Sequence, residues 1–190
     1  MTPRQKLVLA GKNAVDPFNI LTILGTSAIS VGSNPDSAYG PGMRGFARNC
    51  GVVFTEGLTG EFFGTFLIPS LDGQDPHYHR MPNASTGRRI AHAIYQVVWT
   101  QSDTGRPMFN YATVVGTVAD DAVNDLYVPG RELGAGSSAA RIGTALATDP
   151  IDNFITEFVP DLARHIKFRV VLVQRVINRV AIEEGRNGAD

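Results

Sequence analysis

The chain has 190 residues, with 17 Lys and Arg against 18 Asp and Glu, and one cysteine. This length suits one domain with its own core, and a net charge of -1 gives no electrostatic reason to expect a nucleic-acid partner. Cys50 stands alone, which excludes an intrachain disulfide and a cysteine-based zinc site. The first residues lack the apolar core of a secretion signal, so we expect a cytoplasmic or an already processed protein.

Pro and Gly residues recur in the first half of the chain, where they mark turns and predict helices in the segments between them. The first two are expected over about residues 2–15 and 17–31, and the second contains no charged residue. The longest helix is expected over about residues 43–68. It is rich in small residues, and the spacing of Gly60 and Gly64 predicts the close approach of another helix backbone.

Further helices are expected over about residues 88–101, 109–126 and 132–147, followed by shorter or amphipathic segments over 151–158 and 163–184. Asp149-Pro150 is expected to break the helix there. Segments of period 2 flanked by hairpin turns are absent from the sequence, although the Val-rich end leaves a strand as an alternative. The sequence therefore predicts an all-α, single-domain bundle of about six to eight helices over residues 1–184, with a disordered tail over 185–190.

A polar connector, residues 69–89, separates the longest helix from the next one and holds the first candidate site. Asp72, Asp75, His77 and His79 are potential metal ligands within one short loop. Neither an HExxH motif nor a Glu-x-x-His pair accompanies them. Turn formation and solvated imidazoles are therefore the preferred interpretation, a metal is the weaker one, and the sequence names no cofactor.

A second hypothesis concerns the basic residues of the connector and the helix after it. If Arg88 and Arg89 lie in the first turn of that helix, its amides and dipole would add to their charge and hold a phosphate or carboxylate group. His79, Arg80 and His92 complete this candidate anion site. The corresponding alternative function is a hydrolase or anion-binding enzyme centred on Asp75, His77, His79, Arg80, Arg88 and His92.

Acidic residues inside otherwise apolar helices are the natural partners of these arginines. A carboxylate that is buried in a protein is usually paired with a cation. We therefore expect structural ion pairs that lock a Gly-rich bundle, formed by Glu56, Glu61, Asp121, Asp125 and Glu157.

Several short blocks together resemble a family of bacterial envelope proteins that has no assigned activity. The blocks are Gln74-Asp75-Pro76-His77-Tyr78, Gly87-Arg88-Arg89, Thr104-Gly105-Arg106 followed by Phe109-Asn110-Tyr111, Asn124 with Tyr127 and Pro129, and Glu157-Phe158-Val159-Pro160-Asp161. The chain departs from the family pattern at His77, where Arg is usual, and at Val159, where Trp is usual. The resemblance implies a location, the periplasm or a membrane surface, and no chemistry; the alternative is cytoplasmic.

Taken together, these features predict a non-enzymatic helical envelope protein that is membrane-associated or assembly-forming. The uncharged second helix and the amphipathic C-terminal segment carry this expectation. The expected partner is a lipid or an envelope protein, with a homo-oligomer as a further option and no nucleic acid.

Overall fold

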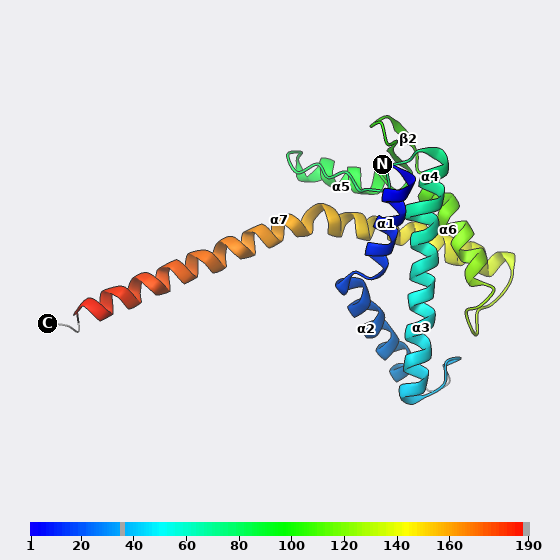
Figure 1. The fold of residues 1–190 in the computed structure, drawn as a ribbon, viewed down its shortest axis with the longest axis horizontal. Helices are drawn as coiled ribbons and strands as arrows, with labels where there is room; N and C mark the ends of the chain where they lie inside the picture. Colours follow the sequence, from blue (N-terminus) through cyan, green and yellow to red (C-terminus); the bar gives the residue numbers. More distant parts are fainter. Residues whose placement is uncertain (35–36, 188–190) are drawn as a thin grey trace.

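The computed structural model describes the backbone of residues 1–34 and 37–187 and the side chains of residues 1–34 and 37–164. Helices dominate the described part of the chain, and its one small hairpin lies at the edge of the body (Figure 1), which confirms the all-α prediction. The hairpin itself was not predicted.

Two N-terminal helices, α1 (Pro3–Ala14) and α2 (Pro17–Ser33), begin where the sequence predicts them. Thr2 caps α1 in a capping box with Gln5, and the Asp16 carboxylate caps α2 by accepting hydrogen bonds from amides of its first turn. The two helices are bent by 45° at the break between them. Among the described residues, no single helix has the length and composition needed to cross a bilayer, but this bent pair has them when the two helices are taken together.

The longest helical rod consists of α3 (Gly42–Glu61), the π-helix η1 (Phe62–Leu67) and α4 (Ile68–Asp72), drawn in cyan and green in Figure 1. The sequence predicts an end near residue 68, but the rod continues to Asp72 and ends at Gly73 in the left-handed conformation, with φ 71. Pro69 lies in the first turn of α4, where its missing N–H costs least. The connector therefore begins four residues later than expected.

The small residues of this rod meet α6 (Tyr111–Asn124), which is capped by Asn110. A Cβ atom built on Gly116 of α6 would lie 3.4 Å from the Cα atom of Gly64 in η1. The close approach predicted from the Gly60 and Gly64 spacing is thus formed, with Gly64 contacting the glycine of the partner helix.

The prediction that no strand is present is wrong for one short segment. Helix α5 (Thr86–Tyr95) ends before the expected residue 101. The strands β1 (Trp99–Gln101) and β2 (Pro107–Phe109) then pair antiparallel in a hairpin. Gly105, with φ 79, supplies the turn. Strands of three residues are too short to show a period of two, which is why the sequence pattern missed them.

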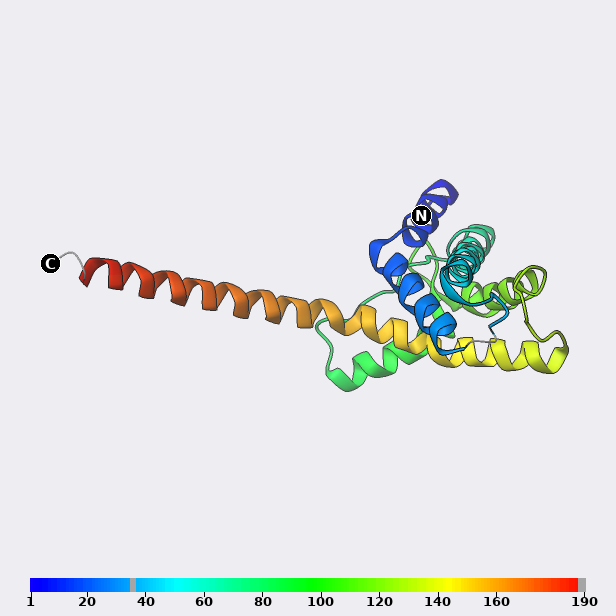
Figure 2. The same cartoon turned by 90° about the horizontal axis from the view of Figure 1, so that it is seen from below.

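The last helix, α7 (Ala135–Asn187), runs through Pro150 and Pro160, so the break predicted at Asp149-Pro150 is wrong. Each proline removes one helical hydrogen bond, but contacts to α5 and α6 hold the helix on both sides of Pro150, including the Asn153 amide bound to the carbonyl of Ala93 at 2.9 Å. Figures 1 and 2 both show the C-terminal half of α7 extending away from the body.

The structure describes only part of the predicted disordered tail, residues 185–190. Helix α7 includes residues 185–187, which were expected to be disordered, and residues 188–190 lie outside the described residues. The side chains of the predicted amphipathic segment beyond residue 164 also lie outside them.

The buried apolar core is small and made mostly of alanine and valine-sized side chains. At least as many polar or charged residues are buried as apolar ones, including Lys6, Gln74, Arg89 and Glu157. Because such groups must be paired when buried, specific polar contacts between helices are as important to this fold as apolar packing. The buried apolar side chains are Ala10, Ala14, Ile23, Val31, Ala93, Val97 and Ala112.

Candidate functional site

The connector places Asp75 between two histidines. Its carboxylate oxygens lie 2.8 Å from His77 Nδ1 and 3.5 Å from His79 Nε2. Burial raises the pKa of Asp75. Hydrogen bonds from the amide and imidazole of His77, together with the charge of His79, lower it by more, so the net pKa lies below its ordinary value. Asp75 therefore orients the imidazole of His77 by a hydrogen bond and lies close to that of His79.

The structure does not bring the proposed metal ligands together as a set. Asp72 ends α4 and accepts a hydrogen bond from the amide of Gln74 at 3.0 Å. Among the described residues, no group of three or more His, Cys, Asp or Glu side chains is arranged to hold a metal ion. The hypothesis that Asp72, Asp75, His77 and His79 bind a metal is therefore corrected: these residues cap a helix and orient each other.

Two arginines of the candidate anion site bind acidic residues of α7. Arg89 Nε lies 2.6 Å from Glu157 Oε1, and its Nη2 atom lies 2.6 Å from Asp161 Oδ2. Arg80 Nη2 lies 2.9 Å from Asp161 Oδ1 and donates to the backbone carbonyl of Glu157 at 2.7 Å. The amide of Met81 donates to Glu157 Oε2 at 3.1 Å. We call Arg80, Arg89, Glu157 and Asp161 the α7 clamp.

The electrostatics of the α7 clamp favour the ionised carboxylates. Burial raises the pKa of Glu157, but Arg89, the Met81 amide and Tyr78 outweigh it and hold the pKa below its usual range. The same buried surroundings and the neighbouring Glu157 raise the pKa of the Tyr78 phenol. The Arg89 guanidinium also lies 4.4 Å from the centre of the Phe158 ring, which adds a cation–π contact.

These contacts correct the hypothesis of an anion site formed by His79, Arg80, Arg88, Arg89 and His92. The guanidinium groups of Arg80 and Arg89 already bind carboxylates of the same chain, and Arg88 is exposed. The His92 Nε2 atom lies 2.8 Å from the carbonyl oxygen of His79. The five side chains therefore do not converge on one free anion pocket, and Arg80, which the alternative enzyme would also use, is already paired with Asp161.

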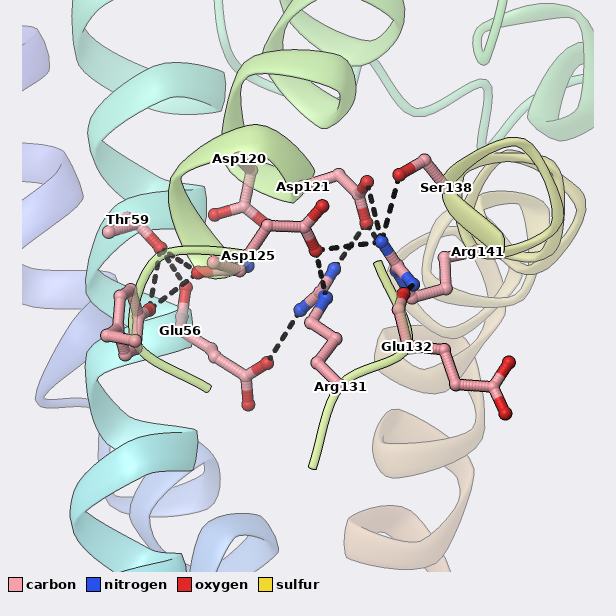
Figure 3. Close-up of polar contacts among 11 residues, drawn as sticks. Glu56, Thr59, Asp120, Asp121, Asp125, Arg131, Glu132, Ser138 and Arg141 are labelled. Carbon is pink, nitrogen blue, oxygen red and sulfur yellow. Dashed lines mark hydrogen bonds and ion pairs between the residues drawn. The ribbon is translucent and has the colours of Figure 1, made fainter. Parts of the chain in front are cut away.

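A second network joins α3, α6, the loop after α6, and α7 (Figure 3). Arg131 forms ion pairs with Glu56 at 3.4 Å, with Asp125 at 2.8 Å and with Asp121. Arg141 of α7 lies 2.8 Å from both Asp121 Oδ1 and Asp125 Oδ1. Bidentate arginines of this kind hold their partners in fixed orientations. We call these five residues the α6 clamp.

A chain of polar contacts lies beside the α6 clamp, on its α3 side (Figure 3). The Thr59 hydroxyl donates to Asn124 Oδ1 at 3.1 Å, and Asn124 Nδ2 donates to Asp120 Oδ2 at 2.9 Å. Burial raises the pKa values of both Asp120 and Glu56, and Arg131 only partly opposes this. The carboxyls on this side are therefore less readily ionised than Asp121, whose pKa is lowered by hydrogen bonding from Arg141.

The sequence named most of the carboxylates in the clamps but not their partners. Glu56, Asp121, Asp125 and Glu157 carry ion pairs, whereas Glu61 accepts a hydrogen bond from Asn13 at 3.1 Å and has no ion pair among the described side chains. The partners Arg131 and Arg141 were missed, as was the buried Lys6, which binds Asp103 at 2.7 Å. The excess of Arg over Lys was the available signal for such pairing.

Comparison with known proteins gives no relative: no family model, no curated protein and no solved structure matches the chain. The arrangement of the two clamps must therefore be interpreted from its own chemistry. Each arginine in them forms ion pairs with carboxylates of the same chain, and each clamp joins helices that are distant in sequence. Their ion pairs are suited to holding these helices together.

Proposed function

We propose that the protein is a non-enzymatic, membrane-associated helical protein of the cell envelope, in which α2 contacts lipid and the two clamps hold the body that presents it. The observation that carries this proposal is the exposed apolar surface of α2. The sequence from Pro17 to Asn34 contains no Asp, Glu, Lys or Arg. Only a line of residues at i, i+4 and i+8, namely Ile23, Ser27 and Val31, is buried.

Four large apolar side chains of α2 are exposed. Phe18 is 71% exposed, Leu21 66% and Ile29 70%, and Leu24 is also exposed. Removing each such side chain from water is favourable by about 1.5–3 kcal/mol. Insertion of this face into lipid would therefore supply a binding free energy of several kcal/mol.

Three exposed hydroxyls of α2 suit an apolar environment because they are hydrogen-bonded within the helix. The hydroxyl of Thr22 donates to the Phe18 carbonyl at 3.0 Å, and that of Thr26 donates to the Thr22 carbonyl at 2.8 Å. Ser33 donates to the Ile29 carbonyl at 2.6 Å. Hydroxyls bonded back to the helix need no water, so they do not oppose transfer of α2 into lipid.

Helix α1 supplies the charge that a lipid surface attracts. Arg4 and Lys12 are exposed, the helix contains no acidic residue, and Leu7 and Val8 are about half exposed. A basic, partly apolar helix next to an uncharged apolar one is typical of segments that lie at or enter the headgroup region. The bend between α1 and α2 permits the first to lie at the surface while the second enters.

Flotation with lipid vesicles tests this proposal. Vesicles of phosphatidylcholine with a fraction of phosphatidylglycerol should carry the protein to the top of a density gradient. The double variant Leu21→Glu, Leu24→Glu should bind at least tenfold more weakly, because each charge placed in the hydrocarbon region costs about 2.5–3.5 kcal/mol.

Leu71→Glu is the matched control, because Leu71 is 76% exposed but lies on α4. It should float like the parent protein. A parent protein that stays at the bottom of the gradient, or equal flotation of the double variant, would contradict lipid binding by α2.

A second candidate function, assembly with further copies of the chain, rests on α7. On α7, Ile151, Ile155, Val159 and Leu162 are all exposed, and the helix then extends away from the body (Figure 2). Analytical ultracentrifugation in a non-ionic detergent should show an oligomer that Ile155→Asp with Leu162→Asp dissociates; a monomeric parent protein would contradict it.

A further inference from the structure

A cleft of about 340 Å³ lies between the connector, the π-helix η1, the start of α6 and the middle of α7. Its volume falls in the range of small-molecule sites, about 300–1,000 Å³. Neither clamp contributes a side chain to its walls, and α2 does not line it. The cleft is therefore separate from both the structural locks and the surface proposed to contact lipid.

The charged groups in the walls are acidic, apart from one imidazole. Asp149 and Asp152 come from one turn of α7, and Asp75 and His77 come from the connector. Asp75 is already paired with histidines. Neither Asp149 nor Asp152 has an ion pair or hydrogen-bond partner among the described side chains, and no Lys or Arg lines the cleft. The half-buried Asp149 and the exposed Asp152 thus lie at this cleft without a cation from the described side chains.

The two carboxylates affect each other. Burial raises the pKa of Asp149, and the charge of Asp152 raises it further. A bound cation would relieve both effects, because it replaces lost hydration and offsets the repulsion between like charges.

Two further residues that line the cleft are uncharged, polar and more than nine-tenths buried. Thr100 is 7% exposed and lines the cleft, and its hydroxyl has no hydrogen-bond partner among the described residues. Gln96 is 6% exposed; its Oε1 atom accepts from the amide of His79, which leaves its Nε2 donors without a partner in the described part of the chain. Both unpaired atoms remain accessible at the surface of the cleft, so a polar ligand in the cleft can form hydrogen bonds with them.

We propose that this cleft binds a small primary amine that also carries an oxygen acceptor. The ammonium group, with its three donors, lies against the carboxylates of Asp149 and Asp152 and donates to the Thr100 hydroxyl. The oxygen of the ligand accepts a hydrogen bond from Gln96 Nε2. An amino alcohol, free or as the deacylated headgroup of an aminolipid, has this pattern of groups.

Isothermal titration calorimetry of the full chain at neutral pH tests this site with ethanolamine and with glycerophosphoethanolamine. At least one of them should bind saturably, and which one binds shows whether the free amine or the headgroup is the ligand. Tetramethylammonium chloride, which has the charge but no N–H donor, should give no saturable heat. Absence of binding by both amines, or equal binding of tetramethylammonium, would overturn the proposal.

Substitutions assign the binding to the cleft. Asp149→Asn and Thr100→Val should each weaken binding about tenfold or more, whereas Glu132→Gln, which removes an exposed charge outside the cleft, should leave it unchanged. Asp149→Asn removes a carboxylate that burial disfavours, so its melting temperature should match or exceed that of the parent. Undiminished binding by the folded Asp149→Asn and Thr100→Val variants would place the amine elsewhere and sink the proposal.

Discussion

The Nε atom of Arg89 lies 2.6 Å from Oε1 of Glu157, whose side chain is completely buried between α5 and α7. This pair and its neighbours Arg80 and Asp161 fix the start of α5 against the part of α7 that contains Pro160. A buried carboxylate that loses its cation is left without compensation, so the pair is the point at which the fold can be tested by one substitution.

Arg89→Ala should lower the free energy of unfolding by about 3–5 kcal/mol, because it leaves Glu157 charged and buried. Arg88→Ala is the control: the neighbouring arginine is exposed, and its loss should change stability by no more than about 0.5 kcal/mol. Urea denaturation followed by circular dichroism measures both. Equal effects of the two substitutions would show that the α7 clamp does not stabilise the fold.

The clamps also predict loss of stability in acid. Hydrogen bonds and charges from arginines hold the pKa values of Asp161, Asp121 and Glu157 below their ordinary range. Groups with depressed pKa values stabilise the folded state at pH values above their unfolded pKa, about 4, and this contribution is lost as pH falls through the folded pKa. The melting temperature should therefore fall steeply below about pH 4, and Glu157→Gln should make that fall shallower.

Asp149 provides the comparison for the acid experiment. Its pKa is raised by burial and by Asp152, so its protonation favours the folded state between its unfolded and folded pKa values. Asp149→Asn should therefore preserve the steep acid loss that Glu157→Gln reduces. An identical pH profile for the parent and Glu157→Gln would contradict the assignment of this loss to the clamp.

Gly45 is needed where the chain turns into α3. A Cβ atom at this position would lie 1.7 Å from the carbonyl oxygen of Gly40, a clash that only movement of the backbone could relieve. Gly45→Ala should therefore lower the melting temperature by several degrees. Gly51→Ala, on the same helix with no atom within 4 Å of the added Cβ, should be neutral or stabilising by up to about 1 kcal/mol. Equal melting temperatures for the two variants would contradict this prediction.

Asn110 links three elements through one side chain. Its Oδ1 atom accepts from Gln74 Nε2 at 2.9 Å and from the Thr113 amide at 3.0 Å, and its Nδ2 atom donates to the Gln96 carbonyl at 2.8 Å. Asn110→Ala should cost about 2–4 kcal/mol, since it removes an N-cap and leaves buried groups unpaired. Chemical denaturation should show this loss, with no comparable change for the exposed Asn83→Ala; a smaller loss, equal to that of Asn83→Ala, would refute it.

Local sequence signals predicted the helices well where caps and turn formers mark their ends. Helices α1 and α2 begin where the sequence predicts them, at the caps Thr2 and Asp16, because such signals act within one turn. Predictions failed where distant contacts decide: α7 continues through Pro150 because α5 and α6 hold it on both sides. The hairpin at Gly105 was missed because its strands are too short for a pattern.

The candidate site was predictable in kind but not in its pairings. Buried acids in apolar helices indicated that Glu56 and Glu157 would pair with arginine, and they do. Which arginine each would meet depends on tertiary contacts between residues far apart in sequence, as for Arg131 and Glu56. The anion hypothesis failed for the same reason, because Asp161 of α7 supplies the charge that Arg80 and Arg89 bind.

Fluorescence quenching by lipids brominated along their acyl chains tests most directly the claim that α2 enters a membrane. In a Trp99→Phe background, which removes the single tryptophan, Leu21→Trp and Leu71→Trp each place one indole at an exposed leucine, on α2 and on α4 respectively. With vesicles of brominated phosphatidylcholine and phosphatidylglycerol, the indole at position 21 should be strongly quenched and blue-shifted, and the one at position 71 should not. Equal, weak quenching at the two positions would contradict insertion of α2.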